Sequence, residues 1–221
     1  LAGIDYSAST PTYKHSLTVL AYKDGQLAWK QDFHDRAYGS FEALTFRNGA
    51  VYAAGAISTE FNAADLTAND GTTVSAPIKK PIDPALKALY DPKNPWFFQD
   101  PTYPIYVKLN GETGQVELAK VLPSPDVQAD DRLRSISVDS QGNVYVGGGG
   151  WNPGPDPNNS FNNADFYWFI RKFSGTGNQQ WEQSAEVVSL DPLTDNLYLT
   201  RYQDQMVQLD PATGNDLKTY N

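Results

Sequence analysis

The chain has 221 residues, of which 40% are hydrophobic and 19% charged, a composition typical of a folded chain that could form a single domain over residues 1–221. Its formal net charge of −9 and its scattered Lys and Arg argue against a nucleic-acid partner, and no apolar stretch approaches the ~20 residues needed for membrane insertion. The absence of Cys excludes disulfides, thiolate nucleophiles and Cys-ligated metals.

Short strands of alternating hydrophobic and polar residues follow one another along most of the chain, joined in pairs by turns rich in Asn, Asp and Gly. Such alternation on both sides of a tight turn predicts a β-hairpin, because these turn residues tolerate positive φ angles. In chain order, the predicted hairpins join 17–22 to 26–29, 43–46 to 51–55, 105–109 to 116–118, 136–139 to 144–148, 168–173 to 179–181, 188–191 to 197–200 and 206–209 to 216–218.

Two successive hairpins form a unit of four antiparallel strands, and such units start near residues 16, 104, 167 and 205. Repeated units of about 40 residues with four strands are typical of propeller blades. A β-sandwich would also show turns every ~8–12 residues and is the structural alternative. The repeated order of turn types favours an all-β fold, a β-propeller of four-stranded antiparallel blades, with about four blades visible.

Two segments, 137–148 and 172–181, resemble bacterial β-propeller repeats of the SBBP type, and Leu209–Gly214 is similar to the quinoprotein-like (PQQ-like) repeat. The resemblance implies a propeller fold and an exported or surface protein. It says little about activity, because such repeats are scaffold. The enzymatic branch of this family, the quinone-dependent dehydrogenases, would need a cationic, metal-bearing pocket that this sequence does not display.

The start of the chain, residues 2–7, aligns with the strand segment 54–58 of the first unit. In one interpretation, this N-terminal strand closes a ring by joining the C-terminal strands, which removes a free sheet edge. In the other, the chain is part of a larger propeller that further sequence completes.

The predicted connections differ in length between the two ends of the strands. Turns within hairpins are short, whereas insertions at about 59–103 and 151–165, and the loops 34–41 and 124–132, all connect one hairpin to the next. Because strands run alternately up and down, these longer segments should share one face. Long loops in compact domains are commonly functional, so this face is the predicted binding surface.

The two insertions supply the candidate binding residues. Aromatic faces stack on sugar rings, Asn and Asp bind hydroxyl groups, and the same mixture makes adaptable protein contacts. The alternatives are an aromatic plug packed on the propeller for the first insertion and a loop capped by its own aromatics for the second. The predicted ligand-binding residues are Trp96, Phe97, Phe98, Trp151, Asn152, Asn158, Phe161 and Asp165.

Acidic residues on the same face could hold one Ca²⁺, which takes six to eight oxygen ligands. The alternative is that they simply carry the negative charge, and no other cofactor is expected. Neither His15 nor His34 belongs to a cluster typical of zinc, no nucleophile elbow or phosphate loop is present, and the glycine run 147–150 predicts close packing. The calcium candidates are Asp126, Asp130, Asp131, Asp156 and Asp165.

These observations favour a non-catalytic extracellular propeller that binds a glycan or a protein through its long-loop face. A second hypothesis is a structural propeller domain of a larger surface, fibre or virion assembly. A third is a glycoside hydrolase that uses a carboxylate pair ~5–9 Å apart, a distance that sequence does not determine.

Overall fold

The structure is a computed structural model that describes residues 17–34, 38–58, 66–74, 102–122, 131–152, 165–185, 187–201 and 205–220. The described part consists of strands and turns, and it contains no helix long and apolar enough to cross a membrane. The strands are β1 (Leu17–Lys23), β2 (Gln26–His34), β3 (Tyr38–Arg47), β4 (Ala50–Ser58), β5 (Leu66–Ala68), β6 (Thr73–Val74), β7 (Thr102–Asn110), β8 (Val116–Val121), β9 (Arg132–Val138), β10 (Val144–Asn152), β11 (Asp165–Phe173), β12 (Gln179–Gln183), β13 (Val187–Leu190), β14 (Leu197–Arg201), β15 (Gln205–Leu209) and β16 (Asp216–Tyr220).

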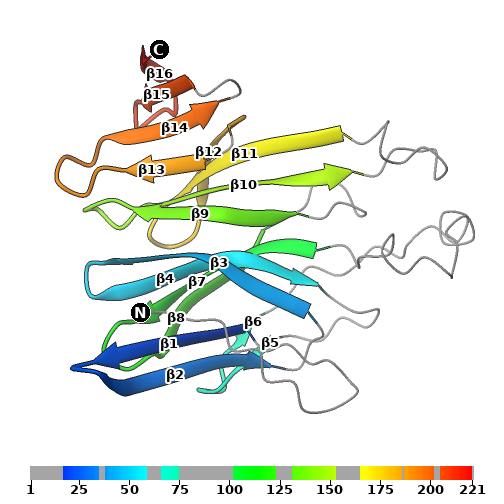
Figure 1. The fold of residues 1–221 in the computed structure, drawn as a ribbon, viewed down its shortest axis with the longest axis vertical. Coiled ribbons are helices and arrows are strands. Elements are labelled where there is room, and N and C mark those ends of the chain that lie inside the picture. Colours follow the sequence, from blue (N-terminus) through cyan, green and yellow to red (C-terminus); the bar gives the residue numbers. More distant parts are fainter. Residues whose placement is uncertain are drawn as a thin grey trace, which may run out of the picture.

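The strands form four antiparallel four-stranded sheets stacked side by side (Figure 1). The first sheet has the order β1-β2-β5-β6, the second β3-β4-β7-β8, the third β9-β10-β11-β12 and the fourth β13-β14-β15-β16. In the last three sheets each strand pairs with the strand that follows it in that sheet, and β3, β9 and β13 lie next to one another along one edge of the stack. These are the blades of a β-propeller, so the predicted fold class is confirmed.

The predicted division of the chain into blades is wrong by two strands. We expected each blade to begin at a strand such as 105–109, but this strand, β7, pairs along its whole length with β4, and β11 pairs in the same way with β10. The long insertions therefore lie within sheets, and the connections 123–130 and 184–186 pass from one sheet to the next. A linear sequence of hairpins does not reveal which connection crosses between sheets, because either choice preserves the strand alternation.

The first insertion contributes two strands that the sequence analysis did not predict. The hairpin β5–β6 adds to the first sheet through the pairing of Ala68 with Phe33 of β2, and its turn lies at Asn69-Asp70. Asp70 accepts hydrogen bonds from the backbone N–H groups of Thr72 and Val116, at 2.9 and 2.8 Å. The second of these bonds joins the first sheet to the second.

The turns of the seven predicted hairpins lie at one end of the strands, and the long insertions between β4 and β7 and between β10 and β11 leave from the other, as the sequence predicted (Figure 1). We call these the short-turn end and the long-connection end. The two tightest turns are Asp24-Gly25, with φ of 52° and 79°, and Asn48-Gly49, with φ of 51° and 75°. Positive φ at both turn residues matches the right-handed twist of the flanking strands, which is why Asp-Gly and Asn-Gly predicted these hairpins.

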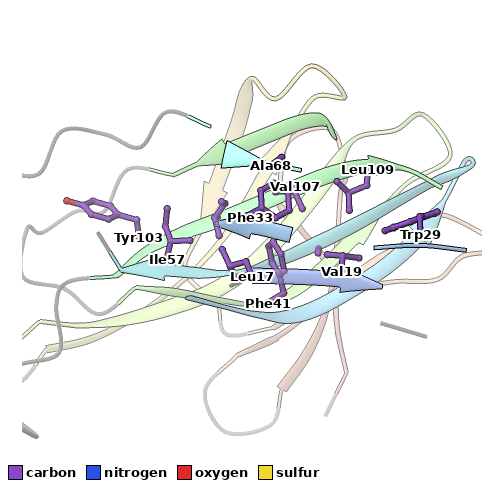
Figure 2. Packing of buried hydrophobic residues seen from close by; sticks show 12 residues of the cluster. Leu17, Val19, Trp29, Phe33, Phe41, Ile57, Ala68, Tyr103, Val107 and Leu109 are labelled. Atoms are coloured by element: carbon purple, nitrogen blue, oxygen red, sulfur yellow. The ribbon is translucent and has the colours of Figure 1, made fainter. Parts of the chain in front are cut away.

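The hydrophobic core consists of three layers, one between each pair of neighbouring sheets. Side chains alternate along a strand, so each inner sheet contributes to two layers. In β4, Ala53 and Ile57 face the first sheet while Tyr52 and Ala54 face the third. Figure 2 shows the first layer, in which Phe33 contacts Phe41 edge to face at 5.9 Å.

A repeated contact links each sheet to the next at the short-turn end. In the first sheet the indole N–H of Trp29 donates to the carbonyl of Gly111, and its ring fills the space beside Gly114, where a Cβ atom would lie 2.6 Å from the ring. Trp181 does the same in the third sheet, beside Gly214. Leu118 takes this place in the second sheet, beside Gly177. These glycines are required both by their positive φ and by the side chain packed on them.

Candidate binding surface

The structure describes only part of the predicted binding site. Trp151 and Asn152 are the last two residues of β10, and Asp165 is the first residue of β11. His34 ends β2. The other candidates lie outside the described residues: Trp96, Phe97, Phe98, Asn158, Phe161, His15, Asp126, Asp130 and Asp156.

The second insertion is shorter than predicted, because β10 and β11 stay paired beyond the expected end of the hairpin. Trp151 pairs with Phe166, and Asn152 pairs with Asp165. The predicted loop 151–165 therefore begins and ends as strand, and only 153–164 connects the two strands. This register brings three of the predicted binding residues together at the long-connection end.

Strand β11 has two different faces at this end. Tyr167, Phe169 and Phe173 face the second sheet and join the second core layer. Phe166 and Trp168 lie on the opposite face, where Phe166 is 67% exposed and the Arg134 guanidinium lies 5.2 Å from the centre of the Trp168 ring. We call Phe166, Trp168 and Arg134 the aromatic patch. The sequence analysis assigned this strand to the scaffold, although the alternation in Asp165–Phe173 could have shown that every second aromatic lies off the core.

Asp131, a predicted calcium ligand, lies directly beneath this region and is fully buried. The Tyr167 hydroxyl donates a hydrogen bond to its carboxylate, and the Thr102 hydroxyl donates to its backbone carbonyl at 2.9 Å. Burial, with a smaller contribution from the Asp131 charge, raises the pKa of Tyr103. These two bonds tie the starts of β7, β9 and β11 together: the carboxylate binds β11, and the backbone carbonyl binds β7.

No group of three or more His, Cys, Asp or Glu side chains that could hold a metal ion occurs within the described parts of the chain. The remaining calcium candidates include three that lie outside those parts, and the side chain of Asp165 is not described. Calcium binding therefore stays a prediction.

The glycine run 147–150 has the close packing that the sequence predicted. A Cβ atom on Gly148 would overlap the backbone carbonyl of Arg132, and one on Gly150 would overlap the Asp131 carboxylate. At Gly149 it would overlap the Trp168 ring. The run lets β10 lie against the groups that support the aromatic patch.

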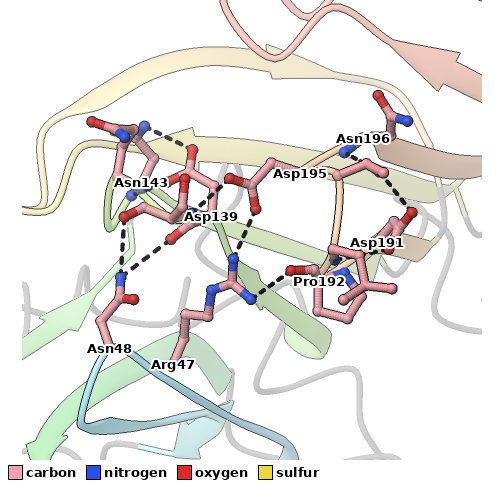
Figure 3. A network of polar contacts seen from close by, with 12 residues as sticks. Arg47, Asn48, Asp139, Asn143, Asp191, Pro192, Asp195 and Asn196 are labelled. Carbon is pink, nitrogen blue, oxygen red and sulfur yellow. Dashed lines mark hydrogen bonds and ion pairs between the residues drawn. The ribbon is translucent and has the colours of Figure 1, made fainter.

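The short-turn end carries a polar network that joins the hairpin turns of three sheets (Figure 3). Arg47 donates to the carbonyl of Pro192 at 2.8 Å and to the carboxylate of Asp195 at 3.0 Å. The other carboxylate oxygen of Asp195 accepts a hydrogen bond from the backbone N–H of Ser140 at 3.0 Å. Hydrogen bonding from Ser140, with a smaller contribution from Arg47, lowers the pKa of Asp195.

Asp139 closes this network from the third sheet. Its carboxylate accepts hydrogen bonds from the backbone N–H groups of Gln141 and Asn143 and from the Tyr145 hydroxyl, at 3.0, 2.8 and 3.0 Å. Asn48 of the second sheet donates to the carbonyls of Asp139 and Ser140. The polar groups of this end are thus used to hold turns, and we place the candidate binding surface at the opposite end.

No family model matches the sequence, and no curated protein matches it. Among solved structures, the chain is similar to quinohemoprotein alcohol dehydrogenase from Comamonas testosteroni, with 11% identity, a TM-score of 0.46, and coverage of 92% of this chain and 32% of that chain. It is also similar to quinohemoprotein alcohol dehydrogenase ADHIIG from Pseudomonas putida HK5, with 12% identity, a TM-score of 0.40, and coverage of 86% and 35%.

A third similar structure is BamB from Moraxella catarrhalis, with 10% identity, a TM-score of 0.24, and coverage of 92% of this chain and 70% of that chain. The chain spans about a third of the length of the two dehydrogenases. At these identities the likeness concerns the fold alone. The four antiparallel four-stranded sheets of the structure agree with the propeller repeats that the sequence resembles.

Proposed function

We propose that this β-propeller domain is a non-catalytic extracellular module that binds a protein partner through its long-connection end. The observation that carries the proposal is the aromatic patch, in which the exposed Phe166 ring stands beside Trp168 and Arg134. Burying an aromatic ring in a partner removes a large apolar surface from water, and Trp, Tyr and Arg dominate the energetics of protein interfaces.

The support beneath the patch favours a preformed surface. Trp168 packs on the open backbone of Gly149, and the neighbouring Tyr167 is held by its hydrogen bond to the buried Asp131. A side chain that is already ordered loses little conformational entropy when a partner binds it. In the backbone register, Trp151 at the end of β10 pairs with Phe166.

A substitution pair at matched phenylalanines tests the proposal. Phe166 is 67% exposed at the long-connection end, and Phe46 is 63% exposed near the short-turn end, so Phe166→Ala and Phe46→Ala remove equal rings from opposite ends. The immobilised wild-type chain and both variants are incubated with proteins released from the surface of the source cells, and captured proteins are quantified by mass spectrometry.

We expect at least one protein to be captured by the wild type and by Phe46→Ala but to be lost with Phe166→Ala. Equal capture by all three chains would contradict the proposal. The same three chains on a glycan array test the glycan partner predicted from the sequence, because a glycan bound only by the wild type and Phe46→Ala would assign the surface to sugar.

A further inference from the structure

The last three sheets repeat the same set of side-chain positions on the face that points toward the next sheet. A tyrosine on the second strand of each sheet is paired with a long polar side chain on the third. The three pairs are Tyr52–Lys108, Tyr145–Lys172 and Tyr198–Gln208.

The first two of these faces are covered by a neighbouring sheet, whereas none of the sheets in the described part of the chain covers the third. Tyr52 is 3% exposed and Tyr145 is fully buried, because each contributes to the core layer that joins its sheet to the next. Tyr198 is only half-buried, and Met206, which stands two residues before Gln208 on the neighbouring strand, is 44% exposed. The outer face of the fourth sheet therefore has the construction of a sheet-docking face.

The residue that docks on a turn glycine of the next sheet stands four positions after a turn glycine of its own sheet, as Trp29 does after Gly25. Leu118 lies beside Gly177, and Trp181 lies beside Gly214. The same register position in the fourth sheet holds Lys218, which is paired with Gln208, is exposed, and lies 4.6 Å from the centre of the Tyr220 ring.

The first sheet presents the complementary feature. Gly25, with φ of 79°, lies in the turn between β1 and β2 and corresponds to the glycines that receive Trp or Leu in the other sheets. Within the described residues no atom lies within 4 Å of the place that its Cβ would occupy. Tyr22 and Leu27, paired with each other beside this turn, are both exposed, and Asp24 precedes the glycine.

From this match we infer that the outer face of the fourth sheet docks on the first sheet of a second copy of this chain, with Lys218 against the Asp24-Gly25 turn. The contact continues a junction that the chain already makes three times, at Gly114, Gly177 and Gly214. The Lys218 ammonium meets the Asp24 carboxylate, and apolar side chains are present on both faces. Two copies that each use both faces form a closed head-to-tail pair. This surface is separate from the aromatic patch.

Light scattering combined with size-exclusion chromatography, over a wide range of concentration, tests the inference on the full chain. We expect a species of twice 24.4 kDa that dissociates on dilution. Lys218→Glu and Asp24→Lys should each weaken self-association by about tenfold or more, because each places like charges against each other. An equimolar mixture of the two variants should associate like the wild type, since one junction then pairs the two new opposite charges and the other keeps the original pair.

Glu112→Lys, in the β7–β8 turn of the second sheet, is the matched control and should leave self-association unchanged. Tyr22→Gln removes the apolar contact without changing the charge, so it tests the same face if a charge variant folds poorly, and it should weaken self-association. A chain that is monomeric at every concentration overturns the inference. So does a dimer that both charge variants leave intact, or one that the mixture of variants does not restore.

Discussion

At the short-turn end the polar side chains bind one another, whereas at the long-connection end an aromatic ring stands in solvent above a buried carboxylate. Arg47, Asp195 and Asp139 hold the turns of three neighbouring sheets together. Phe166 is 67% exposed on a strand whose next residue, Tyr167, is hydrogen-bonded to the buried Asp131. At the short-turn end, polar contacts at the surface stabilise the packing of the blades. At the long-connection end, the stabilising contacts lie beneath the surface, and the apolar area above them is exposed to a partner.

Replacing glycines at the two ends of the β9–β10 hairpin should give the largest difference. Gly148→Ala toward the long-connection end should lower the free energy of unfolding by about 3 kcal/mol, because its Cβ would overlap the Arg132 carbonyl, which is backbone and has little room to move. Gly142→Ala in the turn should cost about 1 kcal/mol, since its φ of 81° is strained for alanine but the space around it is open. Urea denaturation measures both, and a larger cost at Gly142 would contradict the packing argument.

The ion pair at the short-turn end should have a smaller effect. Arg47 and Asp195 are both partly exposed, so their interaction should contribute only about 0.5–1 kcal/mol. A double-mutant cycle with Arg47→Met, Asp195→Asn and the combined variant isolates this coupling from the other bonds of each residue. A coupling near zero would show that the turns of the second and fourth sheets are held by the remaining hydrogen bonds alone.

Acid should loosen the short-turn end before the strands. Hydrogen bonds lower the pKa values of three turn carboxylates below the ordinary value, so the ionised forms stabilise the folded state above about pH 4, and this contribution is lost as the pH falls through the lowered values. Amide exchange, corrected for its intrinsic rate, should therefore accelerate in acid at the donors Ser140, Leu193 and Ala212 but not at Val146 within β10. The three carboxylates are those of Asp191, Asp195 and Asp210. Their main hydrogen-bond donors are Thr194, Ser140 and Ala212, in that order. Unchanged protection at those donors would show that the carboxylates do not hold the turns.

Removing the exposed ring should have the smallest effect on stability. Phe166→Ala should change the free energy of unfolding by less than about 0.5 kcal/mol, because the ring has little burial to lose. Thermal unfolding followed by circular dichroism checks this value. A large loss would mean that Phe166 belongs to the core, and the aromatic patch would then be a structural feature.

The hairpins could be predicted because their determinants are local. Asp24-Gly25 and Asn48-Gly49 adopt the positive φ angles that their chemistry favours, and the strands beside them alternate as expected. The glycine run 147–150 was correctly expected to pack closely, although its individual neighbours could not be named. The prediction that the long insertions share one end is confirmed as well. Each short turn reverses the strand direction, so the number of turns along the chain shows at which end a given strand finishes.

The candidate site was predicted only where it coincides with a loop. Trp151, Asn152 and Asp165 were singled out, and the structure places them in paired strands at the expected end. Phe166 and Trp168 were missed, because an aromatic strand residue is ordinarily a core residue and only the packing of the neighbouring sheet shows which face stays open.

The sequence by itself determined the strands and turns of the seven predicted hairpins and the end from which the long insertions leave, since each depends on a few neighbouring residues. The tertiary structure alone decided which hairpins share a sheet, that β5–β6 completes the first sheet, and which aromatics lie in solvent. These outcomes depend on pairing between distant strands, as in β4 with β7, and on the cover that one sheet gives another. The conformational preferences of the individual strands and turns are the same for every sheet arrangement in which the strands alternate in direction. Packing between the sheets therefore selects which arrangement forms.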